Sequence, residues 1–303
     1  ERAMSEDRDW LYARLYCPGG DDTDALLPAV AAWLGAARER WEIDSAHLLR
    51  FVDLRGHHLR LRVKAAPDVL DQLAAGLAPL DRACRESEAR VLPRLVPDPL
   101  TSAEAGRAGV ALAVYGPEYA KYGGPGGVEA AEAHFDAASR WCLEQRVWEV
   151  PRSEARAALA AHYLARAATA IARPGAAGWH ALGAAPAGEG GVGEATTASG
   201  LLAAHLRAWG SRLPAELRGG AGLEEMVGGV LAAASPSGPL APEMVASLDA
   251  LAEDAALAVG RMSAGDEWRR AIDLLHIDVN RLGLNPAEEA VAGLAARYLL
   301  AGA

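Results

Sequence analysis

Apolar residues follow two different periods along this chain. In the first half, the segments 10–16, 47–55 and 57–65 alternate between apolar and polar residues, and 109–116 is a short apolar run. Such segments are typical of strands in a sheet that buries one face. Arg55 and Gly56 mark the junction between the second and third segments, so the pattern predicts a tight hairpin there.

Helical spacing, with apolar residues three and four positions apart, dominates elsewhere. The expected helices are 22–41, 68–92 and 127–149 in the first half, and 154–172, 194–209, 222–234, 241–263, 267–283 and 286–301 in the second. Asp22 or Thr23 can cap the first helix, and Pro242 and Pro286 stand near helix starts, where proline is tolerated. The glycine- and alanine-rich stretch 173–193 is either a mobile loop or a domain junction.

This order of elements predicts an α+β fold. We expect an antiparallel or mixed sheet packed with helices in the N-terminal half, and a largely helical C-terminal half. The 303 residues suffice for a large core. We expect one domain over residues 1–303, with its α+β part at about 1–150 and its helical part at about 151–303.

Composition and missing motifs exclude several classes of protein. The formal net charge is −10, whereas a nucleic-acid binder normally needs a basic surface, so no nucleic-acid partner is expected. No stretch approaches 18 uninterrupted apolar residues, so no membrane span is expected. Three widely spaced cysteines and a charged N terminus favour a reduced, cytoplasmic protein. Phosphate-loop, dinucleotide and metal-ligand patterns are missing, so we expect neither a cofactor nor a metal.

Three polar segments are candidates for chemistry, and the first is "HHLRLR" at 57–62. On a strand, His58, Arg60 and Arg62 face the same side. Neighbouring arginines can hold a carboxylate or a peptide carbonyl by forked hydrogen bonds. A solvated sheet face is the structural alternative, and the pattern alone favours it.

The second segment is "YGPEYAKYGG" at 115–124. At helical spacing, Tyr115, Glu118, Tyr119 and Tyr122 share one face. Phenols beside a carboxylate can donate and accept protons, while a capping and packing cluster explains them equally well. The glycines at 123–127 lack the lysine and Ser/Thr of a phosphate loop, and they predict a tight turn before a helix.

The third segment is "DLLHIDVNRLG" at 273–283. On a helix, His276 and Asn280 lie on one flank of the apolar stripe, and Asp278 and Arg281 lie on the other flank, where they can pair. A flanking histidine is more often a hydrogen-bonded core residue than a catalyst, although it suits acid–base work near neutral pH.

In this order, the segments resemble the thiopeptide-type bacteriocin biosynthesis family, which includes the glutamate-elimination domain of class I lantibiotic dehydratases. The resemblance runs from about Trp10 to Tyr298. It covers "WLYARLYCPGGDDTDALL", the hairpin "FVDLRGHHLRLRV", "VYGPEYAKYGGPGGVEAAEAHFDAAS" and the late helix "LLHIDVNRLGL". Elimination members of the family remove glutamate from glutamylated serine or threonine in a precursor peptide. Pyridine synthases instead join two dehydroalanines by a formal aza-[4+2] cycloaddition, and then lose water and the leader peptide to form a macrocycle.

Departures from the family's motifs bear on this choice. The late helix has "HID" where the family has "HMH", so Asp278 replaces a histidine. Lys121 stands in place of an arginine, and "PGGDDTD" contains no arginine. Losing basic residues weakens a grip on the carboxylates of a leaving glutamate. The departures therefore favour a pyridine synthase that acts on a precursor peptide with a leader and a dehydrated, azole-containing core. The alternatives are a glutamate-eliminating component of a split dehydratase and a non-catalytic scaffold that binds the precursor.

The predicted site brings the late helix together with the 115–122 turn and the 58–62 strand. The catalytic candidates are His276, Asp278, Tyr119 and Tyr115, and the substrate-binding candidates are Arg60, Arg62, His58, Glu118, Tyr122, Asn280 and Arg281. We expect His276 to shuttle protons, a tyrosine to donate a hydrogen bond to the reacting amide, and an arginine to hold the peptide backbone.

Overall fold

A computed structural model describes residues 8–97, 107–173, 197–262 and 267–302. The chain divides into two compact units that alternate along the sequence. The first unit takes its residues from 1–92, 98–117 and 138–148, and the second from 93–97, 118–137 and 149–303. Apart from Arg173, the predicted connector 173–193 lies outside the described residues.

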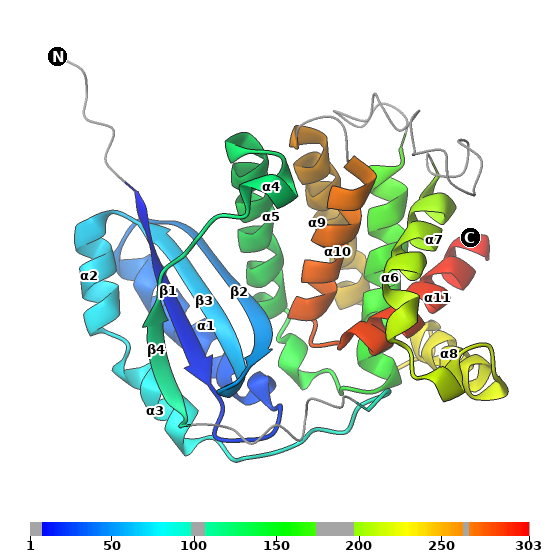
Figure 1. Ribbon diagram of the computed structural model, residues 1–303, viewed down its shortest axis with the longest axis horizontal. Coiled ribbons are helices and arrows are strands. Elements are labelled where there is room, and N and C mark those ends of the chain that lie inside the picture. Colours follow the sequence, from blue (N-terminus) through cyan, green and yellow to red (C-terminus); the bar gives the residue numbers. More distant parts are fainter. Residues whose placement is uncertain (1–7, 98–106, 174–196, 263–266, 303) are drawn as a thin grey trace. The chain divides into compact units, whose positions relative to one another are not determined.

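The first unit is built on a four-stranded antiparallel sheet in the order β2-β3-β1-β4 (Figure 1). Its strands are β1 (Asp9–Tyr16), β2 (Ile43–Asp53), β3 (Gly56–Ala65) and β4 (Gly109–Ala113). The predicted strands and the hairpin are confirmed, and the sheet is of the antiparallel kind. Because side chains alternate along β1 and β3, Tyr12, Arg14 and Tyr16 share a face with His58, Arg60 and Arg62 of the paired strand.

Helices cover the other, apolar face of this sheet (Figure 1). A 3-10 turn, η1 (Thr23–Leu26), leads into α1 (Leu27–Arg40), and α2 (Pro67–Ala75) and α3 (Ala78–Glu86) follow β3. The helix predicted over 22–41 therefore begins later than expected, at Leu27, and Asp22 caps the preceding 3-10 turn, where its side chain accepts a hydrogen bond from Ala25 N at 3.2 Å. The prediction of one helix over 68–92 is wrong. The helix ends at Gly76, a poor helix former, and a new helix begins with Pro79 in its first turn.

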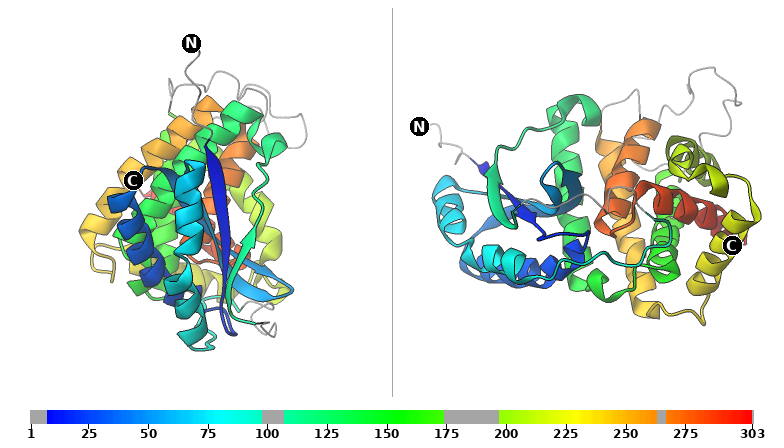
Figure 2. Two further views of the ribbon diagram at one scale, coloured as in Figure 1. Left: turned by 90° about the vertical axis from the view of Figure 1, so that its left-hand side faces the viewer. Right: turned by 60° about the horizontal axis from the view of Figure 1, so that its bottom comes forward.

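The second unit consists of helices (Figure 2). They are α4 (Tyr119–Tyr122), α5 (Pro125–Glu144, whose last turns belong to the first unit), α6 (Glu154–Ile171), α7 (Ala198–Trp209), α8 (Ala221–Ala234), α9 (Pro242–Arg261), α10 (Glu267–Arg281) and α11 (Pro286–Ala301), with 3-10 turns η4 (Gly210–Arg212) and η5 (Ala215–Leu217). One more 3-10 turn, η2 (Val147–Glu149), has its first two residues in the first unit and its last in the second. All six helices predicted for the second half are confirmed over the described residues, and positions 194–196 and 263 of the predicted ranges lie outside them.

Helix α6 lies at the centre of the second unit, where it packs against α7, α8, α9 and α11. Most of its residues are buried on every side, which is the pattern of a helix surrounded by other helices. Many of them are alanines, whose small side chains let the neighbouring helices approach closely. The fixed spacing of α7, α10 and α11 around this helix positions the side chains described below.

Cys17, Cys84 and Cys142 are buried, as expected. In the described part of the chain, no helix combines the length and the apolar character needed to cross a membrane.

Candidate functional site

A row of arginines lies on the sheet face opposite α1, α2 and α3. Arg14 of β1 stands directly opposite Arg60 of β3, and Arg62 follows two positions along the same strand. Arg14 is 3.6 Å from a carboxylate oxygen of Asp53. Among the described residues, Arg60 and Arg62 make no ion pair, and their Nε atoms are buried without a hydrogen-bond partner. The row therefore holds more positive charge than its neighbours neutralise.

Aromatic rings support these arginines. The Arg60 guanidinium lies 3.3 Å from the centroid of the Phe51 ring, and that of Arg62 lies 4.9 Å from Tyr12 and 4.4 Å from Tyr115. Rings attract cations through their faces but do not cancel the charge. Burial lowers the pKa of Arg60, and the neighbouring arginines lower it further. An anion bound at this row would relieve that repulsion.

His58 shares this face, as predicted, but it is a packing residue. Its ring is fully buried and lies 4.4 Å from the centroid of the Tyr16 ring. Its Nδ1 is 3.1 Å from the Gly56 carbonyl oxygen. Burial lowers the pKa of His58, and the nearby arginines add to this effect. A neutral, buried imidazole at the end of the arginine row shapes the row without adding charge.

The "PGGDDTD" loop contains no arginine, yet arginines from elsewhere in the first unit reach it. Arg50 Nη2 lies 2.6 Å from Asp24 Oδ1, and both side chains are buried. Arg90 Nη2 lies 2.9 Å from Asp22 Oδ2. These ion pairs occupy the loop carboxylates, so the loop is a braced structural element.

The 115–122 segment differs from the prediction of one shared helical face. Only Tyr119–Tyr122 forms a helical turn, and Glu118 precedes it as the N-cap residue. Tyr115 belongs to the first unit, where its ring meets the Trp10 ring edge-on with centroids 5.0 Å apart. The shared face is therefore not formed, because Pro117 and the preceding glycine interrupt the helical backbone before Tyr119.

The remaining tyrosines of this segment lie in unlike surroundings. Tyr122 is only 4% exposed and packs edge-on against Phe135, with ring centroids 5.7 Å apart. Burial raises the pKa of Tyr122 well above its usual range, so it is a core residue. Tyr119 is 50% exposed, so its phenol can reach a bound molecule. Glu118 is exposed, and its carboxylate lies 3.9 Å from the Lys121 ammonium.

The predicted tight turn before α5 is confirmed. Gly123 adopts a φ of 82°, which favours glycine. A Cβ atom added to Gly127 would lie 1.7 Å from the carbonyl oxygen of Tyr122, so no side chain fits there. The glycines are therefore explained by the turn itself.

Asp278 lies at the centre of a buried polar network in the second unit. It accepts hydrogen bonds from His134 Nε2 at 2.9 Å, Arg281 Nη1 at 2.6 Å and the hydroxyl of Tyr163. The predicted pairing of Asp278 with Arg281 is confirmed. His134 Nδ1 lies 2.7 Å from Asp254, so both ring nitrogens face carboxylates. Through these bonds, Asp278 connects its own helix α10 with α5, which carries His134, and with α6, which carries Tyr163.

Opposing effects set the charges in this network. Burial lowers the pKa of His134, but Asp278 and Asp254 outweigh it and raise the pKa to about 9. Burial likewise opposes ionisation of Asp278, yet His134 and Arg281 lower its pKa overall. Because the pKa of His134 is raised and that of Asp278 is lowered, His134 is an imidazolium held between carboxylates.

His276, two residues earlier on α10, has a different environment. Its side chain is 23% exposed, and Nδ1 lies 2.6 Å from the buried Glu289 of α11. Its ring stacks on Trp209 with centroids 3.9 Å apart and planes 15° apart. Among the described residues, Nε2 has no hydrogen-bond partner. A carboxylate behind a partly exposed imidazole is the arrangement of a general base. Asn280, one turn further along α10, is half-buried.

The predicted site residues fall into both units. Tyr115, Arg60, Arg62 and His58 belong to the first, and Glu118, Tyr119, Tyr122, His276, Asp278, Asn280 and Arg281 to the second. The approach of the two groups to a common substrate stays a prediction. The sequence did not single out Glu289, Trp209 or His134, because each partner comes from another helix.

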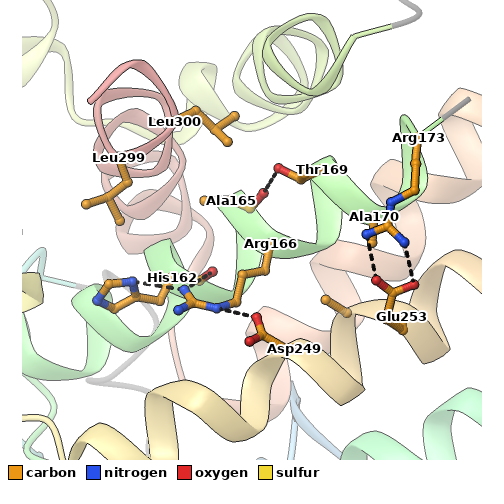
Figure 3. Close-up of a pocket in the computed structure, with 11 residues that line it drawn as sticks. His162, Ala165, Arg166, Thr169, Ala170, Arg173, Asp249, Glu253, Leu299 and Leu300 are labelled. Atoms are coloured by element: carbon orange, nitrogen blue, oxygen red, sulfur yellow. Dashed lines mark hydrogen bonds and ion pairs between the residues drawn. The ribbon is translucent and has the colours of Figure 1, made fainter. Parts of the chain in front are cut away.

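A groove in the second unit contains none of these residues (Figure 3). It has a volume of about 510 Å³ and lies along α6, α9 and the end of α11. Its charges pair with each other, since Arg166 lies 2.8 Å from Asp249 and Arg173 lies 2.7 Å from Glu253. Within the described residues, no group of three or more His, Cys, Asp and Glu side chains is arranged to hold a metal ion.

The sequence matches a known family over residues 10–299, the C-terminal part of lantibiotic biosynthesis dehydratases, and the chain belongs to this family. The family resemblance inferred from the motifs is thereby confirmed. No curated protein matches the sequence significantly.

Solved structures with a similar fold include the tRNA-dependent lantibiotic dehydratase MibB from Microbispora sp. 107891, at 22% identity and a TM-score of 0.61. That similarity covers 98% of this chain but 28% of MibB. The pyridine synthase TbtD from thiomuracin biosynthesis has 16% identity and a TM-score of 0.55, over 97% of this chain and 98% of TbtD. TsrL has 15% identity and a TM-score of 0.55, over 97% and 95%. At identities this low, the structural similarity shows a shared fold.

Proposed function

We propose that this protein is a lyase that acts on a ribosomally synthesised precursor peptide and eliminates glutamate from glutamylated serine or threonine. The observation that carries the proposal is the arginine row, in which Arg60 and Arg62 have no carboxylate partner among the described residues. Membership in a lantibiotic dehydratase family supports the same class of substrate.

The arginine row changes the balance between the two chemistries of the family. From the sequence, missing basic residues favoured a pyridine synthase. In the fold, Arg14 joins Arg60 and Arg62 through the pairing of β1 with β3, which was not apparent in the motifs. The carboxylates of a leaving glutamate match the forked donors of arginine. The alkenes of a cycloaddition carry no such charge, so the row favours elimination.

His276 supplies the base that this reaction needs. Its Nε2 takes the α-proton of the glutamylated residue, and the electron pair of that C–H bond forms the Cα=Cβ double bond. The Cβ–O bond then breaks, and glutamate leaves as a carboxylate. The ion pair with Glu289 stabilises the imidazolium that forms. General-base help of this kind typically contributes a factor of about 10²–10⁴.

A pyridine synthase is the second candidate. The fold similarity to TbtD extends over nearly the whole length of both chains. Tyr119 is half-exposed and can donate a hydrogen bond to the amide that reacts in the cycloaddition. In this case His276 would move the protons for loss of water and leader.

Mass spectrometry after incubation with two peptides tests the proposal. One peptide carries glutamylated serines behind a leader, and the other carries dehydroalanines and azoles. We expect the first to lose glutamic acid. A macrocycle without water and leader from the second peptide would favour the pyridine synthase, and binding without any mass change would favour a scaffold.

A further inference from the structure

Behind His276, one carboxylate is shared by two histidines. Glu289 Oε2 lies 2.6 Å from His276 Nδ1, and Glu289 Oε1 lies 2.8 Å from Nε2 of His205 on α7. We infer that Glu289 and His205 are positioning residues, which hold His276 in the tautomer with its proton on Nδ1 and its lone pair on Nε2. This inference rests on the proposed function only for the catalytic use of that lone pair.

Hydrogen-bond chemistry fixes the protons. An ionised carboxylate accepts hydrogen bonds and donates none. Each histidine nitrogen that faces Glu289 must therefore carry a proton, namely Nδ1 of His276 and Nε2 of His205. A neutral His276 then has its free lone pair on Nε2, the ring nitrogen that remains for a substrate proton.

His205 anchors this arrangement from the buried side. Its side chain is fully buried, and its Nδ1 has no hydrogen-bond partner in the part of the chain that the structure describes. A Cβ atom added to Gly293 would lie 3.2 Å from that nitrogen, so the ring packs closely on the α11 backbone. A proton on Nδ1 would be a buried donor without an acceptor, which is costly. His205 is therefore held as a donor toward Glu289.

The start of α11 holds Glu289 in place, and the Trp209 indole holds the His276 ring. Glu289 lies in the first turn of α11, where the N-terminal dipole favours a negative charge. That turn is set by the capping box of Asn285 and Glu288. The Trp209 ring, stacked at 3.9 Å, restricts rotation of the His276 imidazole.

Replacing Glu289 with glutamine removes the requirement that both facing histidine nitrogens carry a proton. An amide offers one acceptor and one donor group, so one of the two histidines must face an NH₂ group. Either His276 turns its lone pair inward and places a proton on Nε2, or His205 must hold a proton on its buried Nδ1. With its proton on Nε2, His276 has no lone pair for the substrate proton, so turnover should lose part of the factor of about 10²–10⁴ that general-base help contributes.

The test is ¹⁵N NMR of histidine-labelled protein, which distinguishes the two tautomers, combined with turnover of the glutamylated peptide. We expect His276 of the parent to carry its proton on Nδ1. Glu289→Gln should populate the Nε2–H tautomer and lower kcat more than it raises KM. His205→Leu leaves the Glu289 carboxylate facing His276 Nδ1, so it should keep the Nδ1–H tautomer but lower kcat, because Glu289 loses its buried anchor. His205→Gln, which keeps a donor, should restore most of the parent kcat.

His162→Gln is the matched control, since it removes a histidine that hydrogen-bonds the Ala234 carbonyl elsewhere in the same unit. A parent His276 protonated on Nε2 would overturn the inference, even if the variants failed to fold. An unchanged tautomer in folded Glu289→Gln would also overturn it. If the tautomer is as expected but no peptide is turned over, the proposed function fails and the positioning stands.

Discussion

His134 links the stability of the helical unit to pH. Both of its ring nitrogens face carboxylates, at 2.7 Å from Asp254 and 2.9 Å from Asp278. Burial lowers its pKa, but the two carboxylates prevail and raise the pKa to about 9. We predict that the free energy of unfolding falls as the pH rises from about 6.5 to about 9.

The sign and the size follow from the two states of the chain. Below about pH 6.5, His134 is protonated in both the folded and the unfolded chain, so its stabilising effect is fully present. Between about 6.5 and 9, the unfolded chain has lost this proton while the folded chain keeps it. Stability then falls by about 1.4 kcal/mol for each pH unit, or about 3 kcal/mol in all. Above the folded pKa no further loss occurs.

Urea denaturation followed by circular dichroism at several pH values measures this change. The parent and the control His162→Gln should lose stability across the window. His134→Gln should be less stable at about pH 6 and nearly constant from there to about pH 9. A parent with constant stability over this range, or a His134→Gln variant with the parent's slope, would refute the assignment of the proton to His134.

Other changes have equally definite outcomes. Gly127→Ala should lower stability by roughly 3 kcal/mol or more, because its Cβ would meet the Tyr122 carbonyl, whereas Gly126→Ala, with nothing within 4 Å, should leave the melting temperature nearly unchanged. Arg60→Gln combined with Arg62→Gln should raise KM for a glutamylated peptide at least tenfold while circular dichroism stays the same; an unchanged KM would remove the row from substrate binding. Chelation and exhaustive dialysis should leave turnover intact, and recovery of lost activity by one metal ion would contradict the expectation that no metal is needed.

Much of the fold could be predicted because each period of apolar residues reflects a burial pattern. The sheet of the first unit buries one face, so its strands alternate, and the hairpin is marked by Gly56. The break between α2 and α3 was missed because apolar spacing continues through Gly76, and only the backbone preference of that residue marks the end.

The site was predictable only where partners are close in sequence. Asp278 and Arg281 are three residues apart on one helix, so their pairing follows from helical geometry. Glu289 approaches His276 from the next helix and His134 approaches Asp278 from a distant one, and the sequence carries no local signal of either contact. The arginine row likewise needs the register of β1 on β3, which brings Arg14 opposite Arg60.

The central claim is that this protein breaks a Cα–H bond of a glutamylated residue. A peptide deuterated at that carbon tests it most directly, with mass spectrometry over time. We predict that the dehydrated product has lost the deuterium, that glutamate is released, and that single turnover is slower than with the protonated peptide. His276→Gln should reduce the rate by about 10²-fold or more. Release of glutamate with the deuterium retained, or no release at all while a dehydroalanine peptide is cyclised, would contradict the account.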